Sequence, residues 1–383
     1  MQERHRQRVY LSAYFFLSGV CFSTWASRIP TIKTYFGYSD AELGTVLLAM
    51  PLSSLAGLPL SSWLVSHYDS RVPAVFSFIS LAISLFLIGL APTTFTLVAA
   101  VCLFSFSLRI TNIAINTQSI SVQRLFDKKI TGSLHGLWST GGIAGVGICT
   151  LFVALDVPMS IHMAVIATIT IGVAWYAYPH LIKGDRATSG NKYKFGRPDP
   201  FIVYLGLLIF FALVCEGGMF DWSGVFFKEV VHEKIFTLGY LIFMICMATS
   251  RFVSDKLMER LGLPKTFILS AVLVMLGIAL AVSWPQFWPS LIGFCLVGFG
   301  TAAVIPMIYS QAGYSKKYAP GMAVSIIATY GIAGMLLGPP MIGYLAQAFG
   351  LRYAFIAFAI AGFIQFPLSQ MFFRKERGAG SGQ

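Results

Sequence analysis

The sequence predicts an all-α membrane protein with twelve transmembrane helices, arranged as two pseudo-symmetric six-helix bundles. The 383 residues are 56% hydrophobic and only 11% charged, whereas soluble domains carry about 25% charged residues. Apolar runs of about 20 residues recur along the whole chain, and each is long enough to cross a hydrocarbon core about 30 Å thick. The longest polar stretch, 180–200, follows the sixth run and divides the chain into two halves.

Each apolar run is interpreted as one helix, because the short alternating segments of a transmembrane barrel are not seen. Gly and Pro, with 36 and 17 copies, fit helices in lipid. The second helix starts at a capping box, Ser39 to Glu42. The runs lie at 9–33, 41–65, 72–91, 95–123, 133–155, 159–180, 200–226, 236–257, 265–284, 287–311, 320–346 and 352–373.

The two halves repeat weakly. Trp25 in "STWASR" corresponds to Trp222 in "FDWSGV", and "GIAG" occurs at 142–145 and 331–334, in the fifth helix of each half. We therefore expect an N-terminal bundle of residues 1–180, a cytoplasmic linker at 181–199, a C-terminal bundle of 200–374 and a flexible tail at 375–383. Internal repeats of this kind are typical of secondary transporters, whose substrate site lies near the midplane between the repeats.

The net charge of +12 reflects membrane topology. Most of the 27 Lys and Arg residues fall on one side of the predicted helices, which is the cytoplasmic side by the positive-inside rule. The protein is thus expected in the cell inner (plasma) membrane as a multi-pass protein with both termini cytoplasmic, and no nucleic-acid partner is expected. The opposite side holds Lys33, Lys228, Lys234 and Arg352, while Arg28, Arg109 and Arg251 lie at membrane depth.

Enzymatic activity and cofactors are not expected. The sequence has no GxxxxGK(S/T) ATP-binding motif, no HExxH motif and no multi-histidine array. The six Cys residues fall inside predicted helices without a CxxC pair, so they are interpreted as small buried hydrophobes and not as disulfides or metal ligands. The expected partners are a small-molecule substrate, protons and the lipid bilayer, and the protein is expected to be a monomer.

A polar stripe follows the fourth helix. Ser105, Arg109, Asn112, Asn116, Ser119 and Gln123 are three or four residues apart and share one face. A charge at the middle of a span costs several kcal/mol unless it faces protein or water. Arg109, Asn112 and Asn116 are therefore candidate substrate-binding residues on a wet cavity wall. The alternative is that the stripe forms interhelical hydrogen bonds, or that Arg109 pairs with an acid.

A second stripe follows the first helix, where Tyr14, Ser18, Cys21, Trp25 and Arg28 share a face. A Trp beside hydroxyl groups suits stacking on a sugar ring, which makes Tyr14, Ser18 and Trp25 further substrate-binding candidates. Trp25 could equally be an interfacial aromatic anchor.

The seventh helix carries two carboxylates in apolar surroundings, Glu216 and Asp221. Five residues apart, they lie about 140° apart around the helix axis and cannot form a carboxylate pair. Desolvation of the deeper Glu216 favours its neutral form, as a proton carrier requires. The alternative is a structural pair between Glu216 and Arg109. Asp221 is the second proton-coupling candidate, and it could also form an outer-gate ion pair with Arg28 or anchor the helix.

The stretch "SRFVSDKLMERLG", with Arg251, Asp255, Lys256 and Gly262, resembles the loop signature of the major facilitator superfamily. That resemblance implies that Asp255 and Lys256 form a cytoplasmic latch that stabilises an outward-open state. Arg28 and Arg251 complete the expected gate and latch set. The first half has the degraded "SSWLVSHYDSR", in which Ser66 replaces the acid.

Further segments resemble one branch of that superfamily, the bacterial MosC/YbjJ-like transporters: "WASRIP" at 25–30, "NIAIN", "HGLWSTGG" and "EGGMFDWSGVF" at 216–226. The resemblance covers nearly the whole chain. It implies the superfamily fold and a cargo such as an amino-inositol or sugar, while fucose permeases and drug exporters are more distant kin.

Together these features predict a secondary active transporter that moves a small polar organic solute, such as a sugar, an inositol or an amino sugar, by alternating access with proton coupling. Two alternatives stay open. One is a proton-driven exporter of amphipathic drugs, which the 14 Met residues and the aromatic content would suit. The other is a membrane receptor or scaffold that binds a ligand without transporting it.

Overall fold

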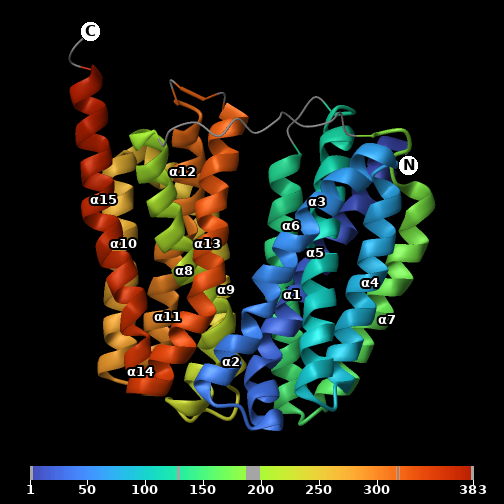
Figure 1. The fold of residues 1–383 in the computed structure, drawn as a ribbon, viewed down its shortest axis with the longest axis horizontal. Helices are drawn as coiled ribbons and strands as arrows, with labels where there is room; N and C mark the ends of the chain where they lie inside the picture. The colour runs from blue at the N-terminus through green and yellow to red at the C-terminus, as the bar shows by residue number, and fades with distance from the viewer. Residues whose placement is uncertain (1–2, 127–129, 187–198, 316, 319, 381–383) are drawn as a thin grey trace. The chain divides into compact units, whose positions relative to one another are not determined.

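A computed structural model of the chain describes residues 3–126, 130–186, 199–315, 317–318 and 320–380. For residues 131, 252, 254, 255, 320, 321 and 375–380 only the backbone is described. Within these ranges all regular secondary structure is helical (Figure 1). Eleven helices are long and apolar enough to span a membrane, and Thr237–Arg251 is a further, shorter apolar helix. The prediction of an all-α polytopic membrane fold is confirmed.

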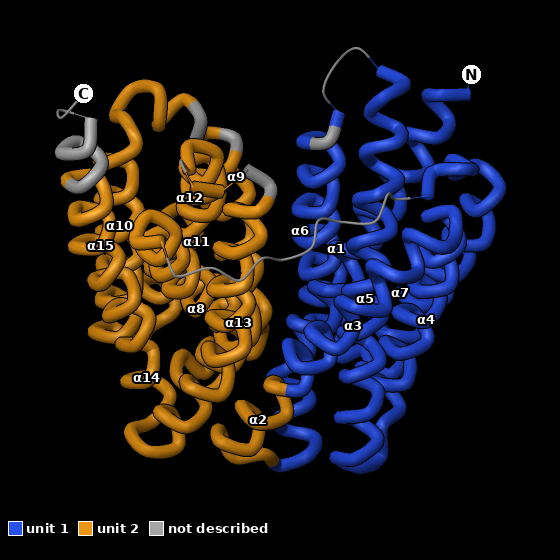
Figure 2. Tube along the Cα trace, turned by 45° about the horizontal axis from the view of Figure 1, so that its top comes forward, with its two compact units in different colours: residues 1–37, 49–192 blue, residues 38–48, 193–383 orange. Residues whose placement is uncertain are grey.

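The helices form two compact units, coloured separately in Figure 2. Unit 1 comprises residues 1–37 and 49–192, and unit 2 comprises residues 38–48 and 193–383. Unit 1 contains α1 (Glu3–Phe36), α3 (Ala49–His67), α4 (Arg71–Leu90), α5 (Thr94–Gln123), α6 (Thr131–Ala154), α7 (Met159–Ala177) and the short 3-10 helix η1 (Tyr178–His180). Unit 2 contains α2 (Asp40–Leu47), α8 (Pro200–Glu229), α9 (Thr237–Leu261), α10 (Leu263–Ser283), α11 (Phe287–Ala302), α12 (Val304–Ala312), α13 (Pro320–Phe349), α14 (Leu351–Ala354) and α15 (Ile356–Gly380).

Two of the expected spans, 41–65 and 287–311, are each interrupted near a proline. The first breaks between α2 and α3 at Leu48, three residues before Pro51, and the second breaks between α11 and α12 at Ala303, three residues before Pro306. Because proline has no backbone N–H, the carbonyl four residues earlier loses its helical hydrogen bond. Both interruptions follow from that missing donor. The expected capping box at the start of α2 is confirmed, since Ser39 and Glu42 cap each other reciprocally.

The segment 38–48 packs in unit 2, although the sequence places it among the first six spans. Its helix α2 crosses α13 where both helices have glycine: a Cβ added to Gly44 would lie 3.1 Å from the Cα atoms of Gly343 and Pro340. One residue further along each helix, the hydroxyls of Thr45 and Tyr344 are 3.1 Å apart and hydrogen-bonded. The absence of side chains at the crossing permits this close approach.

The repeated glycine motifs have the same structural role in both units. In unit 1, Gly141 and Gly145 of α6 pack directly on the carbonyl oxygens of Phe16 and Val20 in α1. In unit 2, Gly334 and Gly338 of α13 pack on the carbonyl oxygens of Phe210 and Val214 in α8. In each unit the fifth transmembrane helix thus contacts the first through glycines four residues apart, which allows the two backbones to meet.

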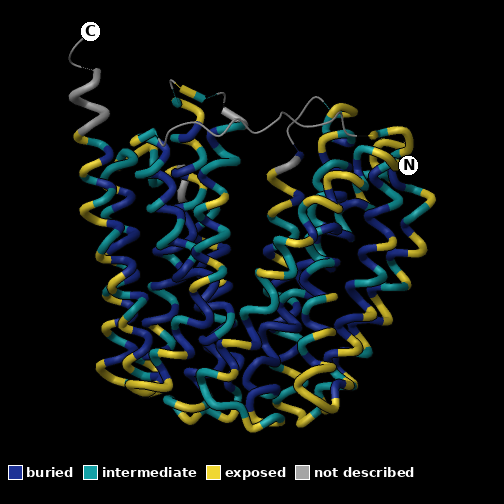
Figure 3. The backbone as a smooth tube through the Cα atoms, in the orientation of Figure 1, coloured by how far each residue is buried: buried dark blue, intermediate teal, exposed yellow. Residues whose placement is uncertain are grey.

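Buried residues line the interior of each helix bundle, and exposed apolar residues lie on its outside (Figure 3). Phe76, Trp175, Trp288 and Phe363 are among these exposed apolar side chains. Such a surface suits a protein whose outer face contacts lipid. The six cysteines are free, and the Sγ atoms of Cys246 and Cys295 lie 2.8 Å apart between α9 and α11.

Candidate functional site

Arg109 lies near the middle of α5 and is held by α3. Its Nε–H donates a hydrogen bond of 2.8 Å to the hydroxyl of Ser54. Gly57, one turn further along α3, faces the aliphatic stem: a Cβ placed there would lie 3.4 Å from both Cβ and Cγ of Arg109. The small residue leaves room for the stem to lie along α3, and the serine orients the guanidinium.

Most hydroxyl groups around Arg109 are occupied by backbone carbonyls. The Ser53 hydroxyl donates to the carbonyl of Cys102, and the Ser105 hydroxyl donates to that of Met50, both at 2.6 Å. These two bonds tie α3 to α5 in both directions. They correspond to the interhelical hydrogen bonding that the sequence left open as the alternative for this stripe.

Further along α5, Asn116 donates its amide to the carbonyl of Asn112 at 2.7 Å, and the Ser119 hydroxyl donates to that of Asn116 at the same distance. Gln123 accepts from the backbone N–H of Ile130. The side-chain amide of Asn112 makes no hydrogen bond to a described residue of unit 1. Arg109 and Asn112 are therefore the members of the predicted stripe with the most free hydrogen-bonding capacity.

The stripe on α1 packs against α7 inside unit 1. The Tyr14 hydroxyl donates to the carbonyl of Ala174 at 3.0 Å, and Cys21 lies 3.4 Å from the Thr170 hydroxyl. Ser18 donates to the carbonyl of Phe15 within its own helix. All three side chains are fully buried, so in this structure none of them offers a surface to a solute.

Trp25 is also buried and packs near Phe104, with ring centroids 6.3 Å apart. Its indole N–H has no hydrogen-bond acceptor among the described residues. Tyr14, Ser18 and Trp25 stay untested as substrate-binding residues. The shared face that suggested them is explained here by packing inside unit 1: Tyr14 bonds to α7, Ser18 bonds within α1, and Trp25 lies near α5.

Arg28 is buried in unit 1 and holds two elements together. Its Nε–H donates to Nδ1 of His162 in α7 at 3.2 Å, and its Nη2 donates to the carbonyl of Val157 at 3.1 Å. Because His162 accepts at Nδ1, its proton is on Nε2, which has no partner among the described residues. Arg28 therefore anchors the start of α7 to α1, a role that the expected outer gate did not include.

Glu216 in α8 forms an ion pair with Arg251 in α9, with 3.3 Å between Oε1 and Nη2. The carboxylate side chain is 8% exposed and the arginine side chain 32% exposed. Oε2 of Glu216 is buried without a hydrogen-bond donor among the described residues. Within unit 2 the partner of Glu216 is thus Arg251, a residue that the sequence assigned to the latch.

Asp221, one and a half turns later in α8, has a different environment. Its carboxylate makes no hydrogen bond or ion pair within the described part of unit 2. The neighbouring Trp222 is fixed, since its indole N–H donates to the carbonyl of Pro339 at 3.2 Å. The two carboxylates of α8 differ in their partners, in keeping with their predicted placement on separate faces.

The predicted latch residues Arg251, Asp255 and Lys256 lie in α9. The side chain of Asp255 lies outside the described residues, and Lys256 is exposed on α9. At the corresponding place in the first half, the Ser66 hydroxyl donates to the carbonyl of Trp63, and the ring of His67 stacks on that tryptophan. Ser66 thus makes a bond within its own helix.

The sequence analysis did not identify Ser54, which bonds to Arg109, or His162, which bonds to Arg28. A histidine inside the apolar run "MSIHMAVIA" is an available signal, because ionisable residues in spans are rare. Ser54 gives no such signal, since serine is common in transmembrane helices.

A third group was missed at the end of unit 1, where Asp185 accepts hydrogen bonds from the backbone N–H of Ser70 at 2.9 Å and from the amide of Gln118 at 3.1 Å. These bonds tie the segment after η1 to α4 and α5.

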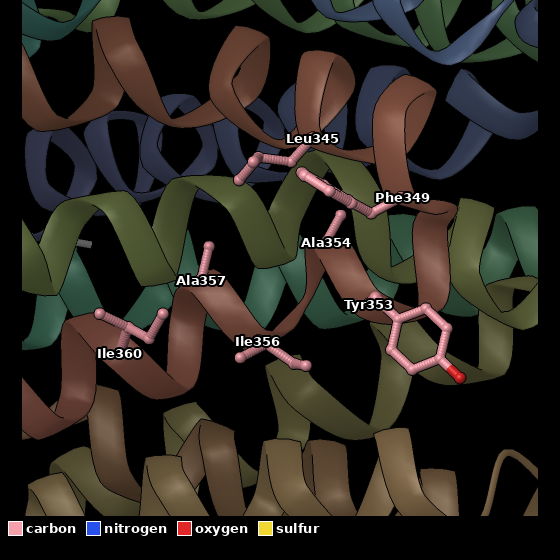
Figure 4. A pocket seen from close by; sticks show the side chains of 7 residues that line it. All are labelled: Leu345, Phe349, Tyr353, Ala354, Ile356, Ala357 and Ile360. Carbon is pink, nitrogen blue, oxygen red and sulfur yellow. The ribbon is translucent and has the colours of Figure 1, made fainter.

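Two cavities within the units are lined by none of the predicted site residues. One of about 340 Å³ lies between α13, α14 and α15 and is lined by apolar side chains with a single hydroxyl, that of Tyr353 (Figure 4). A second, of about 280 Å³, lies between α3, α4 and α5 and includes Ser77, Ser80 and Ser107. Those hydroxyls bond to one another or to Thr111. No group of three or more potential metal ligands occurs among the described residues.

Comparison with known proteins identifies relatives along the whole chain. The model of the Major Facilitator Superfamily matches residues 10–263 and 209–383. An MFS-type transporter of Yersinia pestis is 31% identical over 353 residues, covering 91% of each chain. The membrane protein MosC of Rhizobium meliloti is 30% identical over 367 residues, covering 95% of this chain and 89% of MosC.

Solved structures share the fold at low sequence identity. A bacterial homolog of the human lysosomal transporter Spinster, in an inward-facing and unoccupied conformation, superposes with a TM-score of 0.76 at 15% identity and covers 98% of both chains. The nucleoside transporter NupG superposes with a TM-score of 0.73 at 14% identity, covering 98% of this chain and 99% of NupG. At these identities the likeness concerns the fold alone.

Proposed function

The chain belongs to the major facilitator superfamily, and we propose that it is a secondary active transporter that moves a small polar organic solute by alternating access, coupled to protons. The family consists of membrane transporters and not of enzymes. The solute class is a sugar, an inositol or an amino sugar. The observation that supports this proposal is that each unit holds a charged group at membrane depth with hydrogen-bonding capacity left over: Arg109 in unit 1 and Glu216 in unit 2.

Such groups are costly in a membrane and are retained where they have a function. Arg109 and Asn112 are proposed as the principal substrate-binding residues, because their donors are free within unit 1. Asn116 is proposed as a contact through its remaining amide capacity. Tyr14, Ser18 and Trp25 take second place because they are buried inside unit 1.

Proton coupling is proposed to use the carboxylates of α8. Protonation of Glu216 would neutralise its charge and end its ion pair with Arg251, whose side chain is partly exposed. Loss of that ion pair is a change that a transport cycle can use, because it alters the contact between α8 and α9. Asp221 is the second proposed proton site, since it has no charge partner within the described part of unit 2.

The excess of Lys and Arg on one side supports an inner-membrane location with both termini in the cytoplasm. The protein is proposed to act as a monomer in the lipid bilayer, without nucleic acid. The latch of Arg251, Asp255 and Lys256 is proposed to act at the cytoplasmic side, with Arg28 near the opposite side.

The deciding experiment combines binding and transport. Purified protein is first screened by thermal shift against sugars, inositols, amino sugars and cationic drugs, because a ligand stabilises the folded state by RT ln(1 + [L]/Kd). The ligand found is then tested in proteoliposomes for counterflow and for uptake driven by a pH gradient. A receptor or scaffold would bind without counterflow, and a drug exporter would be stabilised by the cationic drugs only.

Glu216→Gln tests the coupling. Gln resembles the protonated carboxyl in shape but cannot release a proton, so the variant should bind and exchange the solute and lose accumulation driven by the pH gradient. Glu229→Gln, at the end of the same helix, is the matched control and should accumulate solute normally. Normal pH-driven accumulation in Glu216→Gln would move the proton site to Asp221, and Asp221→Asn tests that assignment in the same assay.

A further inference from the structure

The positive charge of Arg109 has no carboxylate near it in unit 1. The acids in the described part of this unit are Glu3, Asp69, Asp156 and Asp185. Each lies at the end of a helix or in a turn, and none lies inside a span. Among the described residues of unit 1, the guanidinium has the neutral hydroxyl of Ser54 as its hydrogen-bond partner. The charge is thus oriented by unit 1 without being neutralised there.

The free donors of Arg109 have a defined geometry. Because Nε donates to Ser54, the two terminal nitrogens, Nη1 and Nη2, remain available at the end of the planar group. They make no hydrogen bond to a described residue of unit 1. Two parallel N–H donors in one plane match the two oxygens of a carboxylate, and this bidentate pairing is stronger than a bond to a neutral acceptor.

The neighbouring polar side chains in the described part of unit 1 are neutral and cannot balance the charge of Arg109. The hydroxyls of Ser53 and Ser105 already donate to backbone carbonyls. Asn112, three residues after Arg109 and on the same helix face, keeps a side-chain amide without a partner in unit 1. The free set is therefore a cationic fork with one neighbouring amide, which can donate to or accept from a hydroxyl.

We propose that the transported solute carries a carboxylate, bound by the guanidinium of Arg109, beside a hydroxyl bound by Asn112. The inference rests on the proposed transport function, and it replaces the neutral sugars, inositols and amino sugars of that proposal with sugar acids and related polyhydroxy acids. A neutral polyol would fill the hydrogen bonds and leave the cation uncompensated at membrane depth, and an ammonium group would be repelled by it. A single guanidinium balances the one charge of a carboxylate, whereas a phosphate ester carries nearly two.

The test uses probes that share a skeleton and differ in charge. Melting of the full-length protein in nanodiscs is measured with D-glucuronate, D-glucose, D-glucosamine and D-glucose 6-phosphate, and with quinate and myo-inositol as a second pair. Carboxylate probes should raise Tm, and the uncharged and amino probes should raise it less or not at all. In Arg109→Gln the apparent affinity for the carboxylate probe should fall by at least about ten-fold, with partial recovery in Arg109→Lys.

Arg124→Gln, the same change at the exposed end of the same helix, is the matched control and should bind the carboxylate probe like the unmodified protein. A Tm shift with glucose, inositol, glucosamine or the phosphate ester that exceeds the shift with the carboxylate probes overturns the proposal that the solute carries a carboxylate. Counterflow of that probe would leave the transport function standing. The absence of any shift with both carboxylates also overturns the proposed carboxylate. If Arg109→Gln binds the carboxylate probe with the same affinity as the unmodified protein, the solute class stands and the assignment of Arg109 as the binding residue is overturned.

Discussion

The arginines at membrane depth in the two units have partners of different charge. In unit 1, Arg109 donates to the neutral hydroxyl of Ser54. In unit 2, Arg251 lies 3.3 Å from the carboxylate of Glu216. The first arrangement keeps a net positive charge, and the second is close to neutral as long as the acid is ionised. In unit 1 a bound solute could balance the charge of Arg109, and in unit 2 a proton could neutralise Glu216.

The helix packing around these groups is similar. In both units, glycines of the fifth transmembrane helix pack on carbonyls of the first, through Gly141 and Gly145 in unit 1 and Gly334 and Gly338 in unit 2. A shared backbone arrangement therefore carries two unlike charge arrangements. Helix packing depends on small residues, and the charge arrangement depends on a few long side chains. The packing can therefore stay the same in both units while the charges differ. The following predictions test that separation, from the largest expected effect to the smallest.

Arg251→Gln should destabilise the protein most. It leaves the carboxylate of Glu216, which is 8% exposed, without its cation. Breaking a buried pair costs about 3–5 kcal/mol, and we expect about 3 kcal/mol because the Arg251 side chain is itself 32% exposed. Unfolding in mixed micelles measures the change. The matched control is Arg260→Gln on the exposed face of α9, and equal stability of the two variants would show that the ion pair contributes nothing.

The double variant Glu216→Gln/Arg251→Gln should recover most of that loss. Two neutral amides of similar size can hydrogen-bond to each other, and no charge is left buried. The double-mutant cycle with both single variants should give a coupling free energy of about 1–3 kcal/mol. Additive single effects would contradict a direct interaction between these side chains.

Glycine substitutions test the shared packing. A Cβ on Gly145 would lie 2.8 Å from the carbonyl oxygen of Val20, so the backbones of α1 and α6 must separate. On Gly338 it would lie 3.4 Å from the carbonyl oxygen of Val214, an ordinary contact. Gly145→Ala should thus cost about 1–3 kcal/mol and Gly338→Ala less than about 0.5 kcal/mol. Thermal melting of both variants measures the two losses of stability. A larger loss for Gly338→Ala than for Gly145→Ala would contradict the packing described here.

Arg109→Gln should have the smallest effect on the protein without ligand. It removes a charge that has no acid in the described part of unit 1, and Gln can still donate to Ser54. The free energy of unfolding should change by less than about 0.5 kcal/mol, as at sites away from special features. The same unfolding assay as for Arg251→Gln gives a direct comparison. A loss as large as that of Arg251→Gln would show that Arg109 is a structural ion-pair partner.

Much of the fold could be predicted because membrane insertion imposes a strong compositional signal. Spans of about 20 apolar residues are visible along one chain, and the repeated "GIAG" marks equivalent helices in both halves. The interruptions at Leu48 and Ala303 were not predicted, although Pro51 and Pro306 are in the sequence. A proline in a transmembrane helix can kink it, break it or be accommodated, and the neighbouring helices decide which outcome occurs.

The sequence predicted which residues belong to the candidate site, but it did not predict which of them contact each other. A shared helix face selected Arg109 and Asn112 together, because the helical period is a local property. The same argument selected Tyr14, Ser18 and Trp25, which the structure buries inside unit 1. A polar face predicts that something polar is opposite, and it cannot distinguish a solute cavity from a neighbouring helix.

By itself the sequence determined the membrane class, the helical fold, the family and the presence of Glu216, Asp221, Arg109 and Arg251 inside helices. Those conclusions depend on composition and on residues close in the chain. Only the tertiary structure decided that Glu216 meets Arg251 in α9, that Ser54 orients Arg109, and that residues 38–48 pack with unit 2. These contacts join residues 35 or more positions apart, and which of several polar groups meet is set by how the helices pack and not by any local pattern.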